Sequence, residues 1–216
     1  KKVAENGRRD PEHEFGTNPC SEIILRPYQF CNLTEVVIRA TDEAKDLKRK
    51  VRLASQLGTY QSTLTDIKYL RKIWRDNTEE ERLLGVSLTG IMDNQLTIEA
   101  DPKLLKSMRE MAVETNKDLA KKLKIPQSAA TTCIKPSGTV SQLVDSASGI
   151  HTRHSDYYIR TVRGDNKDPL TQMMKDQGIP NEPDVMNPSI VSVFSFPTAS
   201  PKGCLLYTSP SPRDSD

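Results

Sequence analysis

Hydrophobic side chains recur along the chain with the spacings of both helices and strands. Apolar positions three and four residues apart predict a helix from about Asp42. Thr41 or Asp42 can cap its start, and Gly58 marks its end or a break. A weaker helical pattern covers about 65 to 74. The stripe that the first helix is expected to bury consists of Ala44, Leu47, Val51, Ala54 and Leu57.

A second, longer helix is predicted to begin at Asp101 and Pro102, because aspartate is a good N-cap and proline fits the first turn. Lysines near its far end suit the negative end of the helix dipole, and Pro126 stops it. Its predicted apolar stripe consists of Leu104, Met108, Met111, Thr115, Leu119 and Leu123.

Short apolar runs predict the strands. Residues 83–93 form one such run bracketed by glycines, and "AATTCIK" forms another. Residues 22–38 indicate two extended pieces around a turn at Pro27. Further along the chain, "YYIRTVRG" predicts a strand, "PLTQMMKDQG" a helix and "SIVSVFSFP" a strand. Strands that alternate with helices are typical of an α/β fold.

Composition limits the class of protein. Only 35% of the 216 residues are hydrophobic and 5% aromatic, a modest core that favours a piece of a longer protein. The net charge of +2, from 31 basic and 29 acidic residues, gives no electrostatic case for binding nucleic acid or membranes. The chain has no apolar run of membrane-spanning length, so we expect a soluble, cytoplasmic protein.

The end of the chain breaks the pattern abruptly. The tail "CLLYTSPSPRDSD", residues 204–216, resembles translated adapter sequence. We therefore expect this tail to be non-native and the rest to be an internal fragment.

The four cysteines fit neither a zinc site nor a dense disulfide framework, because they lie 11, 102 and 71 residues apart. No "CxxC" pair is present, which argues against a thiol–disulfide exchange protein. Cys133 is interpreted as a buried strand residue. His151 and His154, in "HTRH", are interpreted as surface residues, and no metal site is predicted.

The segment "GTNPCSEIIL" carries candidate chemistry at Asn18, Cys20 and Glu22. In extended backbone these alternate side chains would point the same way. The adjacent carboxylate disfavours a thiolate nucleophile at Cys20, but it does not hinder a neutral thiol that loses a hydrogen atom. The carboxylate could then act as a general base while the amide orients a substrate oxygen. An ordinary loop with a buried cysteine remains an alternative.

Two further features admit two interpretations each. Cys31 could be a redox thiol that cycles between dithiol and disulfide, or a small buried hydrophobic residue. In "TTCIKPSGTVSQLV" a strand ends at Lys135 and a helix starts near Thr139. The turn between them could bind an anion, because Gly138 lets an oxyanion approach free backbone N–H groups. It could equally be a plain helix cap.

Taken together, these motifs resemble a known family. "NPCSE" followed by "CNLTEVV" resembles the active-site loop of ribonucleotide reductase large chains, and "KPSGTVS" is similar to their substrate-phosphate loop. "GVSLTGIMDN" and "YYIRTVR" are similar to their barrel segments, in the same order. "FCNLTEVVIRA" is most similar to the adenosylcobalamin-dependent, class II, triphosphate-reducing branch.

The resemblance implies a role for each residue of the first motif. Cys20 would become a thiyl radical that takes a hydrogen atom from C3′ of the ribose. Glu22 would accept the 3′-hydroxyl proton, and Asn18 would hold the substrate hydroxyl and the glutamate. Cys31 would be one half of the dithiol that reduces the substrate, with its partner in an upstream segment that this chain does not include.

The resemblance also implies a fold, a cofactor and partners. The fold is the second half of a ten-stranded α/β barrel, with residues 1–203 as part of a catalytic domain. This domain would contain a finger loop at 14–38 and a phosphate turn at 135–142. The cofactor would be adenosylcobalamin, and the partners a ribonucleotide and a thioredoxin-like reductant. The residues that match the phosphate-binding turn are Pro136, Ser137, Gly138, Thr139 and Ser141.

Three alternatives remain open at this point. The chain could come from a class I or dimeric class II diphosphate reductase, which would use the same motifs. A glycyl-radical reductase driven by formate is disfavoured, since it would not need the dithiol of Cys31. A non-catalytic nucleotide-binding module would leave Cys20 without a function. We expect the chain alone to be inactive.

Overall fold

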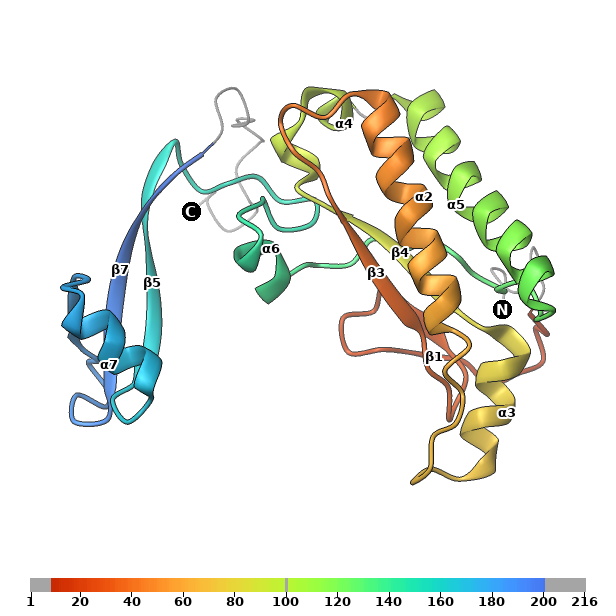
Figure 1. The fold of residues 1–216 in the computed structure, drawn as a ribbon, viewed down its shortest axis with the longest axis horizontal. Coiled ribbons are helices and arrows are strands. Elements are labelled where there is room, and N and C mark those ends of the chain that lie inside the picture. The colour runs from red at the N-terminus through yellow and green to blue at the C-terminus, as the bar shows by residue number, and fades with distance from the viewer. Residues whose placement is uncertain (1–8, 100, 201–216) are drawn as a thin grey trace, which may run out of the picture. The chain divides into compact units, whose positions relative to one another are not determined.

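The computed structural model describes residues 9–99 and 101–200 and divides the chain into two compact units (Figure 1). The first unit ends at Thr152 and the second begins at Arg153. The candidate site residues of the first motif and of the turn all fall in the first unit.

A parallel sheet forms the centre of the first unit. Strand β3 (Asn32–Val37) pairs in parallel with β4 (Leu84–Thr89). On the other side of β4, residues 130–134 run in the same direction but form only an isolated bridge, between Val86 and Thr132. The strand predicted from "AATTCIK" is therefore much shorter than expected. One further backbone hydrogen bond, from the Leu84 amide to the Ala130 carbonyl at 2.9 Å, also holds this segment along β4.

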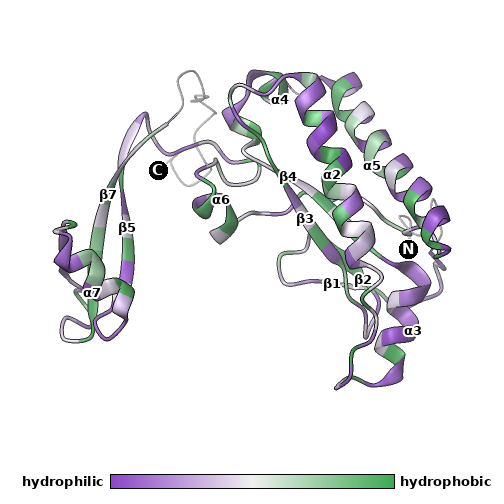
Figure 2. Ribbon diagram, in the orientation of Figure 1, coloured by the Kyte–Doolittle hydropathy of each residue, from purple (hydrophilic) through white to green (hydrophobic). Residues whose placement is uncertain are grey.

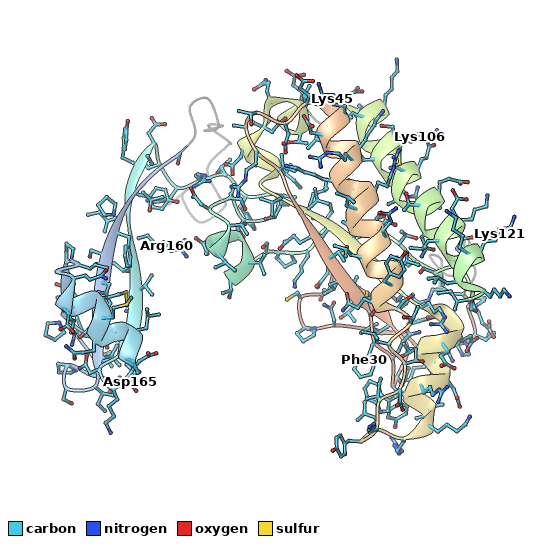
Figure 3. All side chains as sticks on the ribbon, in the orientation of Figure 1. Phe30, Lys45, Lys106, Lys121, Arg160 and Asp165 are labelled. Carbon is cyan, nitrogen blue, oxygen red and sulfur yellow. The ribbon has the colours of Figure 1, made fainter. Side chains whose placement is uncertain are left out.

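Two helices cover one face of this sheet. Helix α2 (Ala44–Gln61) and helix α5 (Pro102–Leu123) pack against β3 and β4. In Figure 2 both helices mix hydrophilic and hydrophobic stretches, as amphipathic helices do. Figure 3 labels Lys45, Lys106 and Lys121 on their solvent-facing surfaces. The core between helices and sheet contains Val36, Ile38, Leu47, Val51, Ala54, Val86, Met108 and Ala112.

Helix α2 differs from its prediction at both ends. Its N-cap is Glu43, which forms a reciprocal capping box with Asp46, rather than Thr41 or Asp42. The helix also runs through Gly58, where a Cβ atom would lie 3.3 Å from the side chain of Leu84. This glycine therefore permits close packing of helix on strand and does not end the helix.

The weak helix predicted over 65–74 is wrong. The structure has a helix, α3, at Lys72–Glu81 instead. Its sequence "KIWRDNTEEE" is almost entirely polar, so it carries no apolar stripe to read. In α5 the start at Asp101 is confirmed, because its side chain accepts a 2.9 Å hydrogen bond from the Lys103 amide. The buried face of α5 is shifted from the predicted stripe and consists of Met108, Ala112, Asn116 and Ala120.

Three short helical elements also belong to the first unit. The 3-10 helix η1 (Ile91–Asp93) and helix α4 (Gln95–Ile98) follow β4, and helix α6 (Thr139–Leu143) follows the segment 130–134. The helix predicted after "KPSG" is thus confirmed.

The second unit is an antiparallel sheet with one helix. Its strand order is β5 (Tyr157–Asp165), β7 (Val191–Ala199) and β6 (Asn181–Pro183). Helix α7 (Pro169–Asp176) packs closely on this sheet, since a Cβ atom on Gly164 would lie 2.3 Å from Thr171 Oγ1. The predicted strands and helix of this region are confirmed.

Within residues 9–99 and 101–200, no helix combines the length and the apolar character that crossing a membrane requires.

Candidate active site

A short hairpin carries the first motif. Strand β1 (Gly16–Thr17) pairs antiparallel with β2 (Ile24–Leu25). The tip is a tight turn closed by a 2.9 Å hydrogen bond from the Ser21 amide to the Asn18 carbonyl. Ser21 has a φ of 61°, in the left-handed region. The prediction that this backbone is extended is therefore wrong, and the turn, rather than strand alternation, sets the directions of the side chains.

Asn18 holds the hairpin together from inside the turn. Its backbone amide donates to the Ile23 carbonyl at 3.2 Å, and its side-chain Oδ1 accepts from the Ile23 amide at 3.0 Å. The amide oxygen therefore has a structural role that the sequence alone did not indicate. The Nδ2 group is the part of this side chain that can still donate to a substrate oxygen.

Cys20 and Glu22 lie at the tip in different environments. Cys20 is an exposed free thiol. Glu22 is half-buried, and its Oε2 atom is buried without a hydrogen-bond partner among the described residues. A buried carboxylate oxygen without a partner is costly, and such groups cluster where a function requires them. The tip thus joins an accessible thiol to a carboxylate oxygen that has no hydrogen-bond partner among the described residues.

The hairpin rests on the face of the sheet that the helices leave open. Val86 belongs to the core under the helices, so its neighbour Gly85 faces the opposite side. A Cβ atom on Gly85 would lie 2.5 Å from Leu33, 3.0 Å from Cys133 Sγ and 3.2 Å from Ile23. Gly85 therefore leaves the space in which hairpin, strand and Cys133 come together.

Cys31 lies directly before β3 and is half-buried. Burial, reinforced by Cys133 and Glu22, raises the pKa of the Cys31 thiol to about 12. Burial, followed by the charge of Glu22, likewise raises the pKa of Cys133 to about 11. Both thiols are therefore protonated at neutral pH. The interpretation of Cys133 as a buried strand residue is confirmed in part, because it is half-buried beside the bridge at Thr132.

Sequence reasoning missed one acidic residue on this open face. Glu35 lies on β3 two residues beyond Leu33, and its Oε1 atom is buried with no hydrogen-bond partner in the described part of the chain. It contributes to the raised pKa of Cys133, which places the two groups near each other. Strand periodicity could have found it, because residues 31, 33 and 35 share one face.

The second motif forms a turn braced by its own hydroxyl groups. Ser137 Oγ accepts from the Ser141 amide at 3.1 Å, and Ser141 Oγ donates to the Gly138 carbonyl at 2.8 Å. Ser137 and Ser141 are both buried. Pro136, Gly138 and Thr139 are exposed, and a Cβ atom on Gly138 would meet nothing within 4 Å. The open side of the turn is thus backbone around Gly138 and the Thr139 hydroxyl, rather than the two serine hydroxyls.

Strand β4 connects the hairpin to this turn. Gly85 contacts the hairpin, and Ser87 Oγ accepts a 2.8 Å hydrogen bond from the Lys135 amide at the entrance to the turn. Gly85 and Ser87 lie two residues apart on the same face, which corresponds to roughly 6–7 Å along a strand. Both motifs therefore meet the same face of the same strand.

The two histidines of "HTRH", His151 and His154, are exposed, as predicted. Among the described residues, no group of three or more His, Cys, Asp or Glu side chains is arranged to hold a metal ion. Cys204 and the tail lie outside the described residues.

Known proteins resemble this chain in sequence, although no family model matches it. The chain is 31% identical over 210 residues to the adenosylcobalamin-dependent ribonucleoside-triphosphate reductase of Lactobacillus gasseri, covering 84% of this chain and 28% of that protein. The protein of the same name from Lactobacillus leichmannii is 30% identical over the same shares.

The fold of the chain also resembles that of a solved structure of the same enzyme class. The chain matches a B12-dependent, class II ribonucleotide reductase with a TM-score of 0.72 and 25% identity, over 92% of this chain and 31% of that chain. The expected α/β fold, as part of the reductase barrel, is confirmed. The chain spans less than a third of the length of the relatives that it matches. It is therefore homologous to a segment of the adenosylcobalamin-dependent, class II ribonucleotide reductases.

Proposed function

We propose that this chain forms part of the catalytic centre of an adenosylcobalamin-dependent ribonucleotide reductase. The reaction converts ribonucleoside triphosphates to 2′-deoxyribonucleotides, the precursors of DNA. The observation that carries the proposal is the hairpin tip. There the exposed thiol of Cys20 lies two residues from Glu22, whose buried carboxylate oxygen has no partner in the described part of the chain. The names of the homologous proteins support the reaction and the substrate class.

In this proposal Cys20 and Glu22 act on the same ribose. Cys20, as a thiyl radical, takes the hydrogen atom from C3′ and returns it at the end of the cycle. The radical at C3′ acidifies the 3′-hydroxyl, and Glu22 accepts its proton. The unpartnered Oε2 of Glu22 supports this role, because it has an unused acceptor position. The Nδ2 group of Asn18 orients the substrate hydroxyl.

Cys31 supplies part of the reducing power. The 2′-hydroxyl leaves as water, and two electrons and two protons come from two thiols that become a disulfide. The raised pKa of Cys31 keeps it protonated, so it can deliver a proton to the leaving hydroxyl. A partner thiol from outside this chain and a thioredoxin-like protein that re-reduces the pair complete the cycle. The partner thiol and the thioredoxin-like protein are both parts of this proposal.

Cys20 would receive its radical from a group bound outside the hairpin. Cys20 is exposed at the tip, which fits a sulfur that receives a radical from a separately bound group. When bound, adenosylcobalamin supplies an organic radical that removes the hydrogen atom of a thiol. The contribution of this chain is the position of Cys20.

The turn after Lys135 is proposed to hold the substrate phosphates. The open backbone at Gly138 and the exposed Thr139 hydroxyl support this role, since free N–H groups bind phosphate oxygens. Pro136, Ser137 and Ser141 shape the turn. We further propose that the enzyme acts in the cytoplasm and that the 216-residue chain is inactive by itself.

Replacement of Cys20 tests the proposal. In the full-length protein with adenosylcobalamin, Cys20→Ser should lower deoxyribonucleotide formation at least about 10³-fold, because it removes the group that carries the radical. Binding of the ribonucleotide should be retained. The control is Cys133→Ser, which changes a half-buried free thiol without an assigned role and should keep near-normal turnover.

Three outcomes would point to the alternatives. Unchanged function in Cys20→Ser would favour a non-catalytic nucleotide-binding module and refute the proposal. Full turnover of the unaltered enzyme without adenosylcobalamin would favour a class I reductase. Turnover of diphosphates in preference to triphosphates would favour a diphosphate reductase.

A further inference from the structure

A buried group of polar side chains lies at the base of the hairpin. Arg9, Gln29 and Glu81 come from three separate parts of the chain and are each less than 10% exposed. Charged side chains are rarely so buried unless they are paired. We call these three residues the hairpin clamp.

Arg9 connects the hairpin to helix α3. Its Nε and Nη2 atoms donate to the two carboxylate oxygens of Glu81 at 3.1 Å and 2.8 Å. Its Nη1 atom donates to the backbone carbonyl of Ile24, on strand β2, at 2.7 Å. One guanidinium group therefore joins the second strand of the hairpin to the last residue of the helix through its rigid geometry.

Gln29 closes the clamp from the chain that leaves the hairpin. Its Oε1 accepts from Arg9 Nη2 at 3.2 Å and from the Arg26 amide at 2.9 Å. Its Nε2 donates to Glu81 and, at 3.3 Å, to the Asn77 carbonyl. Both polar atoms of this side chain are thus used: Oε1 joins Arg9 to the chain at Arg26, and Nε2 ties Gln29 to α3.

Glu81 in turn is fixed to the sheet. Its carbonyl accepts a 2.8 Å hydrogen bond from Ala129, at the start of the segment beside β4. Leu84, the first residue of β4, follows three residues later. The clamp therefore transmits the position of the sheet to the hairpin by a continuous set of short contacts.

Stability alone is a weak reason for such a cluster. Replacing a buried ion pair with apolar residues of similar size is often neutral or stabilising, so a buried pair is weak evidence for a gain in stability. The geometry that the cluster specifies here is that of the hairpin that ends in Cys20. Gly85 and Ile23 seat the hairpin on the sheet, but that contact is apolar and lacks direction.

We propose that the hairpin clamp of Arg9, Gln29 and Glu81 is a positioning device that sets the place of Cys20 for reaction with the substrate. This inference rests on the proposed function for its effect on turnover. None of the three residues is assigned a contact with substrate, so they are positioning residues. Their loss should lower kcat and leave KM nearly unchanged, because the phosphate turn does not depend on them.

The test uses the full-length protein and a variant that removes the clamp but keeps the volume. Arg9→Met combined with Glu81→Met leaves no buried charge unpaired. We expect a melting temperature close to the unaltered protein, and kcat lower by about 10²-fold, the cost of a misplacement of about 1 Å. KM should stay within about twofold. The control is Lys72→Met with Asp76→Met, an exposed ion pair on the same helix, which should change none of these three quantities.

A second measurement does not depend on turnover. The alkylation rate of Cys20 by iodoacetamide, followed by mass spectrometry without cofactor, should change several-fold in the clamp variant and not in the control. If the unaltered protein forms no deoxyribonucleotide, the proposed function fails while this measurement still tests the clamp. Gln29→Met, which removes hydrogen bonds but no charge, is the second variant and should change alkylation in the same direction.

The inference is overturned by a folded double variant with normal kcat and a normal Cys20 alkylation rate. If the double variant does not fold, Gln29→Met decides alone. A changed alkylation rate with a normal melting temperature then supports the clamp, and an unchanged rate overturns it.

Discussion

The hairpin and the phosphate turn meet the same face of β4, but they are held in place differently. The hairpin is fixed by contacts between residues far apart in sequence, such as Arg9 with Glu81. The turn is braced mostly from within, by Ser137 with Ser141 and by the Ser148 hydroxyl, which donates to the Ser137 carbonyl. The thiol end of the proposed site therefore depends on remote residues, whereas the phosphate end is held mostly by residues 137–148, with Ser87 of β4 as a remote contact at its entrance.

This difference predicts separate kinetic effects for the two regions. Changes around the hairpin should alter the chemical step, since they move Cys20 and Glu22 relative to the substrate. Changes in the turn should alter binding, since they affect only the phosphate contacts. The following variants, all in the full-length protein, either break this comparison or sharpen it.

The largest effect is expected for Glu22→Gln. The amide has no basic oxygen of comparable strength, so kcat should fall by about 10² to 10⁴-fold, the contribution typical of a general base. Deoxyribonucleotide formation under saturating substrate is the measurement. Glu14→Gln, at an exposed position before the hairpin, is the control. A kcat within twofold of normal for Glu22→Gln would remove this residue from the site.

Gly85→Ala should displace the hairpin from its seat. Its new methyl group would lie 2.5 Å from Leu33, which must move, and 3.2 Å from Ile23 of the hairpin, which must give by a few tenths of an ångström. We expect about 1–3 kcal/mol of destabilisation, typical of overpacking, together with a lower kcat. Thermal unfolding and steady-state kinetics are the measurements.

The control for this variant is Gly16→Ala in the hairpin itself, where a Cβ atom meets nothing within 4 Å. Equal stability and equal kcat of Gly85→Ala and Gly16→Ala would show that the contact at Gly85 does not position the hairpin.

Gly149→Ala should damage the turn instead. Gly149 has a φ of 53°, and its Cβ atom would lie 3.0 Å from the Lys135 carbonyl oxygen at the entrance to the turn. We expect about 1–3 kcal/mol of strain and a KM raised several-fold, with kcat nearly unchanged. Direct measurement of ribonucleotide affinity by calorimetry checks this.

Gly178→Ala is the matched control, because Gly178 has a similar φ of 74° in the second unit with open space around it. The Gly178→Ala variant should be less stable than the unaltered protein and should bind the ribonucleotide with unchanged affinity. A lower kcat with normal affinity in Gly149→Ala would contradict the separation of the two regions.

The last and smallest expected effect concerns the rate at which the half-buried thiols react with an alkylating reagent as the pH is raised. Because the pKa of Cys31 is about 12, the thiolate is the minor form below that pH, and at pH 8 it amounts to about 10⁻⁴ of the thiol. Alkylation of Cys31 should therefore be slow and should rise about tenfold per pH unit. Cys133, with a pKa of about 11, should react about tenfold faster at equal access. Mass spectrometry of the labelled peptides measures both rates, and rapid alkylation of Cys31 at pH 7 would contradict the raised pKa.

The sequence predicted those parts of the fold that local patterns determine. The start of α5 at Asp101, the strands of the second unit and the helix after the turn follow from caps, alternation and turn residues. Helix α3 was missed because its sequence is polar and its position depends on contacts of Asn77 and Glu81 with the hairpin. A pattern within one segment holds no information about such contacts.

The candidate site shows the same division. Cys20, Glu22 and the turn could be found from short motifs, but the tight turn at Ser21 and the structural use of the Asn18 oxygen could not. The hairpin clamp was invisible in the sequence, since its residues lie up to 72 positions apart. Glu35 could have been predicted from strand periodicity, but it does not belong to any of the short motifs.

The central claim is that Cys20 at the hairpin tip and the turn at residues 136–141 act on one ribonucleotide. A crystal structure of the full-length protein with a bound ribonucleoside triphosphate tests it most directly. The account predicts the triphosphate on the open side of the turn at Gly138 and the Cys20 sulfur about 3.5 Å from C3′ of the ribose, as a reactive arrangement requires. A nucleotide bound elsewhere, or a Cys20 sulfur in solvent and far from the sugar, would contradict it.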